Sequence, residues 1–160
     1  MSLARCLLIA FALLFIGQTV SAETADEFTA RMTEVSLVGR FTVDAAGRDG
    51  DLPRKDRYEI ASIEQVRGNQ FRVNARIAYP KADGEKVDIT VPILVNIDFA
   101  SGTPLLSVTD LKIPLLGEGF SSRVVFDGDR YAGTWQHGKV GGHMWGRIEP
   151  IEPDTTPVAP

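Results

Sequence analysis

The residues best suited to chemistry gather in the stretch RYAGTWQHGKVGGHMWGRI, Arg130 to Ile148. It contains both histidines and both tryptophans of the chain. A pair of histidines could ligate zinc or copper, but a zinc site in a protein uses three or four ligands at recurring short spacings. No third ligand stands at such a spacing from His137 or His143, so we predict no metal site and no cofactor.

Other reactive side chains are sparse. The single cysteine, Cys6, precedes an apolar segment, and no serine-hydrolase, zinc-protease or phosphate-loop motif occurs. Glu64 would point inward under simple strand alternation, and a buried Glu64 would be a candidate acid or base. A bulge that we expect near Ala61-Ser62 would disturb this alternation, and we favour a solvated Glu64. We therefore predict that the protein is not an enzyme.

Two turns predict how the strands around the histidines pair. Gly138-Lys139 suits a type II′ turn, and Asp127-Gly128 suits a type I′ turn as its central pair. The resulting opposite pairs are His137 with Val140, Trp135 with Gly142, Gly133 with Met144, Tyr131 with Gly146, Phe126 with Asp129, Val124 with Tyr131, Ser122 with Gly133, and Phe120 with Trp135.

Opposite residues share a face of the sheet, so the two turns together sort the side chains into two faces. One face holds Phe120, Val124, Phe126, Tyr131, Trp135, Val140 and Met144, with His137 at its rim. The other face holds Ser121, Arg123, Thr134, Gln136, His143, Trp145 and Arg147. Because turns assigned independently give one apolar face, we expect that face to line the interior.

The elements around this stretch are strands. From Val35 onward, runs such as QFRVNARIAY and KVDITVPILVNID alternate apolar and polar residues, which is typical of half-buried antiparallel strands. About eight strands with short connections predict an all-β fold, an antiparallel up-and-down β-barrel over residues 35–150, with a β-sandwich as the alternative. Pro92 marks an edge, bulge or bend. Thr24 and Glu27 form a capping-box pattern, which predicts a short N-terminal helix over residues 23–34 across one end of the barrel.

The two ends of the chain have different compositions. Arg5, the apolar run Leu7 to Ile16 and Val20-Ser21-Ala22 form the pattern of a signal peptide over residues 1–22. This predicts a secreted or periplasmic protein with no membrane anchor after cleavage. Residues 151–160 are rich in proline and predict a disordered tail. The formal net charge of −4, without a basic block, argues against nucleic-acid partners, and no pattern identifies a protein partner.

The expected interior could hold a small apolar or amphipathic ligand. Its candidate lining residues are Phe71, Phe120, Tyr131, Trp135, Met144, Leu115 and Leu116. The two leucines belong to DLKIPLLGEGF, Asp110 to Phe120, which we predict to be an apolar loop that forms either a plug or a lid at one barrel end. The alternative function is a non-enzymatic structural or protein-interaction module of the inhibitor type, in which the same residues fill a closed core.

Short motifs resemble the calycin group of secreted barrels. LVGRF, Leu37 to Phe41, is similar to the first-strand G-x-W motif of lipocalins, with Phe41 in place of tryptophan. The resemblance implies an arginine on the last strand packed against this aromatic ring, and Arg147 matches by position. AGTWQHGKVGG, Ala132 to Gly142, resembles the GTW strand of avidins. YAGTW followed by GGHMWG also resembles small secreted bacterial proteins, a likeness that implies no function.

Overall fold

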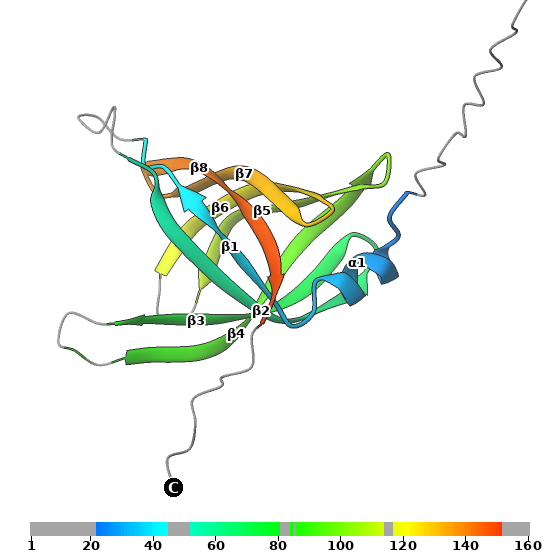
Figure 1. Ribbon diagram of the computed structural model, residues 1–160, viewed down its shortest axis with the longest axis horizontal. Coiled ribbons are helices and arrows are strands. Elements are labelled where there is room, and N and C mark those ends of the chain that lie inside the picture. Colours follow the sequence, from blue (N-terminus) through cyan, green and yellow to red (C-terminus); the bar gives the residue numbers. More distant parts are fainter. Residues whose placement is uncertain (1–21, 45–51, 81–83, 85, 114–116, 152–160) are drawn as a thin grey trace, which may run out of the picture.

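The computed structural model describes residues 22–44, 52–80, 84, 86–113 and 117–151. They form a helix, α1 (Ala25–Arg31), and a closed antiparallel barrel in which each strand pairs with its sequence neighbours and β8 pairs with β1 (Figure 1). The strands are β1 (Val35–Phe41), β2 (Arg54–Arg67), β3 (Gln70–Pro80), β4 (Lys86–Ala100), β5 (Thr103–Ile113), β6 (Gly117–Asp127), β7 (Arg130–His137) and β8 (Val140–Pro150). The predicted up-and-down barrel is confirmed and the sandwich is wrong. Apart from residues 22 and 151, the predicted signal peptide and tail lie outside the described residues.

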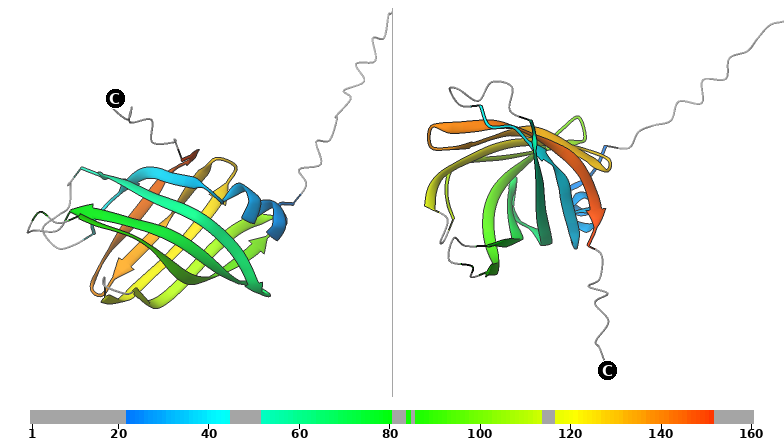
Figure 2. Two further views of the ribbon diagram at one scale, coloured as in Figure 1. Left: turned by 90° about the horizontal axis from the view of Figure 1, so that it is seen from below. Right: turned by 60° about the vertical axis from the view of Figure 1, so that its left-hand side comes forward.

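Helix α1 forms where the capping box predicted it. The Thr24 hydroxyl accepts a hydrogen bond from the Glu27 backbone N–H, and the Glu27 carboxylate accepts one from the Thr24 backbone N–H at 2.9 Å. These bonds satisfy two of the free N–H groups at the helix start. Phe28 and Met32 share one face and are buried, at 0% and 2% exposed. This face seats α1 across one end of the barrel (Figure 2).

The period-two pattern of the sequence becomes the inner and outer faces of the wall. Phe71, Val73 and Ala75 of β3 are buried, while Arg72 and Arg76, on the other face of the strand, are exposed. Inward side chains of β4 alternate in the same way, with Val91, Val95 and Ile97 buried. Burial of alternate apolar side chains fixes each strand's face because a one-residue slip would expose them all.

The β7–β8 hairpin has the predicted pairing, and the β6–β7 hairpin does not. His137 pairs with Val140 and Trp135 with Gly142, as expected. In the preceding turn Gly128 takes a positive φ of 55° and is the first central residue, so Asp127 pairs with Arg130. The predicted partners are corrected to Phe126 with Tyr131, Val124 with Gly133, Ser122 with Trp135, and Phe120 with His137. The shift is two residues, so the assignment of faces survives.

The predicted bulge in β2 is present. The pairing with β3 shifts between Ile60 and Ser62, and both Ile60 and Ile63 are buried. The bulge turns Glu64 outward, where its carboxylate lies 3.4 Å from the Arg72 guanidinium. The side chain of Glu64 is 56% exposed, so the solvated alternative for Glu64 is confirmed and the buried acid or base is wrong.

Most of the segment predicted as an apolar loop is strand. β5 continues to Ile113 and β6 begins at Gly117, with Leu111 paired to Phe120. Pairing shifts between Val108 and Leu111, where Asp110 takes a positive φ of 50°. These register shifts are β-bulges, and they let β5 and β6 stay paired on both sides of Asp110. Leu115 and Leu116 lie outside the described residues, so the predicted plug or lid is not described.

The β3–β4 hairpin leaves the wall at the end away from α1. β2 pairs with β3 only from Glu59–Arg76 onward, and β4 pairs with β5 only over Asn96–Ala100. The stretch of β4 that contains Pro92 therefore has β3 as its described partner, in keeping with the predicted edge or bend. Figure 1 shows the distal part of this hairpin projecting from the barrel. At the base of the hairpin, Arg76 of β3 forms ion pairs with Glu59 of β2 at 2.7 Å and with Asp88 of β4 at 2.6 Å.

Candidate ligand-binding site

The interior is more deeply buried near α1 than at the opposite end, although Phe99 beside Phe28 is only partly buried. Near α1, Phe28 and Phe71 are 0% exposed. Tyr58 lies opposite Leu37 and so faces the same side of the wall, yet Tyr58 is 43% exposed and Leu37 only 8%. Further inward residues that are only partly buried are Phe41, Asp56, Ile93, Val108, Phe120 and Trp135. We call this part of the interior, away from α1, the open half.

One row of inward positions in the open half combines charge, glycine and tyrosine. Asp56 of β2 pairs with Gly39 of β1, Gly39 pairs with Gly146 of β8, and Gly146 pairs with Tyr131 of β7. Tyr58 lies two residues from Asp56 on the same face of β2. The strand pairing thus gathers one carboxyl and two phenols, from Asp56, Tyr58 and Tyr131, on neighbouring parts of the inner wall.

Tyr131 lies along the wall over the two glycines. A methyl group at Gly146 would come within 2.8 Å of Tyr131 Cε1, and one at Gly39 would overlap the Tyr131 hydroxyl. Tyr131 is 3% exposed, and its hydroxyl is buried without a hydrogen-bond partner among the described residues. A buried hydroxyl in this state costs about 1–3 kcal/mol. The wall therefore carries a buried hydroxyl whose hydrogen-bonding capacity the described residues do not meet.

The charge of Asp56 sets the electrostatics of this row. Desolvation raises the pKa of its carboxyl above 3.8, against the opposing effects of hydrogen bonds with the Tyr58 hydroxyl and the Arg57 backbone N–H. Although Tyr58 is 43% exposed, desolvation beside Asp56 raises the pKa of its phenol, and the negative charge of Asp56 raises it further. Desolvation, then the same charge, raises the pKa of Tyr131 to about 12. Both phenols therefore stay protonated at neutral pH and can donate hydrogen bonds.

The raised pKa of Asp56 predicts a pH-dependent gain in stability for Asp56→Asn. The folded state holds the Asp56 proton more tightly than the unfolded state, so this residue costs stability as pH rises from 3.8 through its folded pKa. Asparagine has no such cost. We expect Asp56→Asn to melt above the parent at neutral pH, and the difference to shrink as the pH falls toward 3.8. Thermal melts across this range measure it, with the exposed Asp44→Asn as the control, and a difference that does not change with pH would contradict the assignment.

The residues predicted to line the ligand site divide between the two halves of the barrel. Phe71 packs 6.4 Å from Phe99, centroid to centroid, in the filled end, and Met144 is 8% exposed within the core cluster. Trp135 belongs to the open half, where its ring meets Phe41 edge-on at 5.9 Å. The other member there is Phe120, whose ring stacks on His137 at 4.0 Å. Tyr131 belongs to the buried core cluster, and its hydroxyl lies against Gly39 in the open half.

Asp56 and Tyr58 did not appear among the predicted site residues. Residues 47–55 look like a long polar loop, but β2 already begins at Arg54 and extends the inward face by Arg54, Asp56 and Tyr58. The available signal was the position of Arg54, Asp56 and Tyr58 at every second residue before the apolar Ile60, which places all four on one face of a strand. It was hidden because three of the four residues from Arg54 to Arg57 are basic and the fourth is Asp56.

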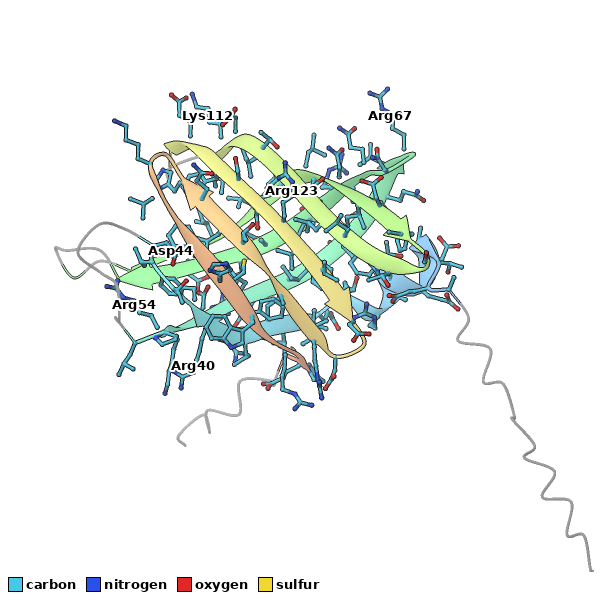
Figure 3. The ribbon with its side chains drawn as sticks, turned by 90° about the horizontal axis from the view of Figure 1, so that it is seen from above. Arg40, Asp44, Arg54, Arg67, Lys112 and Arg123 are labelled. Atoms are coloured by element: carbon cyan, nitrogen blue, oxygen red, sulfur yellow. The ribbon has the colours of Figure 1, made fainter. Side chains whose placement is uncertain are left out.

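The histidines lie apart from this row. His143 faces outward, as predicted, and its Nδ1 lies 3.4 Å from Asp44 Oδ2. Within the described residues, no group of three or more His, Cys, Asp or Glu side chains could hold a metal. A hollow of about 570 Å³ lies on this outer face of the wall. Figure 3 labels Asp44 and Arg123, two of the residues that line it. Most of its lining is outward-facing, namely Asp44, Thr109, Ser121, Arg123, Thr134, Gln136, Gly141 and His143.

Several polar groups of the outer hollow have hydrogen-bond partners. Arg123 donates hydrogen bonds to the Val108 carbonyl and, at 2.8 Å, to the Thr109 hydroxyl. The Asp44 carboxylate accepts one from the Thr42 hydroxyl at 3.1 Å. The buried Tyr131 hydroxyl has no such partner in the part of the chain that is described. Among the described residues, the Tyr131 hydroxyl is thus the one buried side-chain polar group without a partner, and we place the candidate site around it, inside the barrel.

Comparison with protein-family models, with curated proteins and with solved structures gave no match to this chain. The arginine contact implied by the lipocalin resemblance is not formed by Arg147, which pairs with Asp129 on the outer wall. Phe41 instead packs against Trp135. No helix among the described residues has the length and apolar character needed to cross a bilayer.

Proposed function

We propose that this protein binds a small amphipathic molecule in the open half of its barrel. The observation that carries the proposal is the contrast between Tyr58 and Leu37, which share a face but are 43% and 8% exposed. Side chains that face inward and still meet solvent can be reached by a ligand. The open half offers apolar contacts from the partly buried Trp135, Phe41 and Ile93 beside a few polar groups, the composition expected of a ligand site.

The position of the opening also supports this proposal. The β3–β4 hairpin separates from β2 and from β5, so strand pairing on both sides of this hairpin stops at the end that α1 does not cover. We further propose that binding occurs after export, because Arg5, the apolar run and Val20-Ser21-Ala22 form a signal peptide pattern.

The neutral fluorophore N-phenyl-1-naphthylamine is expected to bind saturably and to quench Trp135. Trp145 is on the outer wall and 39% exposed, so Trp145→Phe leaves Trp135 as the reporter of the interior. Trp135→Phe leaves Trp145 and is the matched control, in which we expect much weaker quenching. Fluorescence titration of both variants measures this. No saturable binding to the folded protein, or equal quenching in the two variants, would reject the interior site.

A second candidate is a protein-interaction module without a ligand. Its support is an apolar row on the outer wall, where Val125 pairs with Ala132 and Ala132 with Trp145. Val125 is 43% exposed and Trp145 39%. Failure of the fluorophore to bind would leave this candidate standing.

A further inference from the structure

We propose that the ligand of the open half is an amphipathic amine, whose ammonium group pairs with the Asp56 carboxylate between the phenols of Tyr58 and Tyr131. This rests on the proposed function and names the chemistry of the ligand's polar end. The first support is the position of Asp56, which faces inward opposite Gly39. A carboxylate withdrawn from water is costly unless a cation or several hydrogen bonds compensate it.

The described residues around Asp56 give its carboxylate two hydrogen bonds, from the Tyr58 hydroxyl and the Arg57 backbone N–H, but no paired cation. Across β1 and β8 its row continues with Gly39 and Gly146, which have no side chains. No salt bridge within the described ranges includes Asp56. Arg54 is the next inward position of β2 toward the opening, and it is exposed (Figure 3). Desolvation accordingly outweighs the hydrogen bonds in the pKa of Asp56.

The Tyr131 hydroxyl is the second and independent support. It is buried, lacks a partner among the described residues, and is aimed along Gly39 toward the Asp56 side of the row. A phenol oxygen can accept a hydrogen bond from an ammonium group, and its ring face attracts a cation. The same wall therefore offers a negative charge, an unused acceptor and aromatic faces, which together suit a cation.

An anionic ligand suits the row less well. A carboxylate or sulfate next to Asp56 would add a second negative charge in a partly desolvated place, which raises the free energy of both groups. Arg54 could hold an anion, but only near the opening. The apolar contacts from Trp135, Phe41 and Ile93 would hold the ligand's hydrocarbon part whichever polar end it carries.

The test is competition by molecules with one tail and different heads. Octylamine, octanol and octanoate are titrated at neutral pH against protein carrying bound N-phenyl-1-naphthylamine. We expect octylamine to displace the fluorophore at least about tenfold more effectively than octanoate, because a hydrogen-bonded charge pair contributes roughly this much. Asp56→Asn should remove the preference for the amine, measured as the ratio of the octylamine and octanoate affinities within the same variant.

Two more variants test whether the effect of Asp56→Asn comes from a general change in charge and whether weaker binding comes from unfolding. Asp44→Asn removes the same charge from the outer wall and should leave the amine preference intact. Tyr131→Phe loses a hydroxyl that has no hydrogen-bond partner among the described residues, so it should melt at or above the parent temperature while binding octylamine several-fold more weakly. If the fluorophore binds and octylamine has no advantage, or Asp44→Asn acts like Asp56→Asn, the amine inference is overturned. If octanoate is preferred, Arg54 holds the polar end instead. If the fluorophore does not bind, the proposed function fails first.

Discussion

Replacing Phe28 by alanine is expected to lower the free energy of unfolding by about 3–5 kcal/mol, the usual cost of emptying a buried phenylalanine site. Phe28 is 0% exposed, and its ring meets Phe126 at 5.4 Å and Phe99 at 5.9 Å, both edge-on. These three rings come from α1, β6 and β4, so the cavity would open where the helix closes the barrel. Domains of this kind have only about 5–15 kcal/mol of stability, so the loss is large.

Chemical denaturation of Phe28→Ala and of Leu94→Ala measures this effect. Leu94 is 50% exposed, so its truncation removes apolar atoms without opening a cavity and should change stability by about 0.5 kcal/mol or less. Trp135 lies in the open half, away from α1, and its emission in folded Phe28→Ala should match that of the parent. Equal midpoints for the two variants would mean that α1 does not seal the barrel.

The strands and the barrel followed from alternation because the inner wall must be apolar along every strand. Phe71, Val73 and Ala75 show why this works, since their burial excludes a one-residue shift. The same pattern cannot detect a two-residue shift, which keeps every side chain on its face. The predicted pairing of β6 with β7 was wrong for this reason. Asp127-Gly128 and Gly128-Asp129 are both acceptable central pairs, and only the pairing of Asp127 with Arg130 decides between them.

The candidate site was harder to predict because it depends on pairing between distant segments. Tyr131 was predicted to face inward, but its contact with Gly39 requires β8 to close on β1. Asp56 belongs to a charged segment that resembles a loop, and it becomes part of a wall only because β1 pairs with it. Local propensity does not report such pairing, since strand formation depends on cross-strand neighbours.

Gly142→Val is expected to destabilise the protein by about 1–3 kcal/mol, the usual cost of overpacking. Gly142 lies opposite Trp135, as the turn at Gly138 predicted. The obstruction, however, comes mainly from the backbone of the chain after β1. A methyl group at Gly142 would overlap the Thr42 carbonyl oxygen and lie 2.8 Å from the Thr42 carbonyl carbon. Backbone atoms held by neighbouring strands cannot move aside as a flexible side chain could.

The Thr42 carbonyl gives this variant a spectroscopic signature as well. It accepts a hydrogen bond from Trp135 Nε1 at 3.0 Å, so a side chain at Gly142 must disturb the indole when it displaces the carbonyl. We expect Gly142→Val, in a Trp145→Phe background, to melt lower than its parent and to shift the emission of Trp135. Ala132→Val adds a β-branched side chain at an exposed position of β7 and should change neither quantity. A Gly142→Val protein with the parent's melting temperature and emission would show that Thr42 does not lie against Gly142, and the contact between β8 and the end of β1 would have to be redrawn.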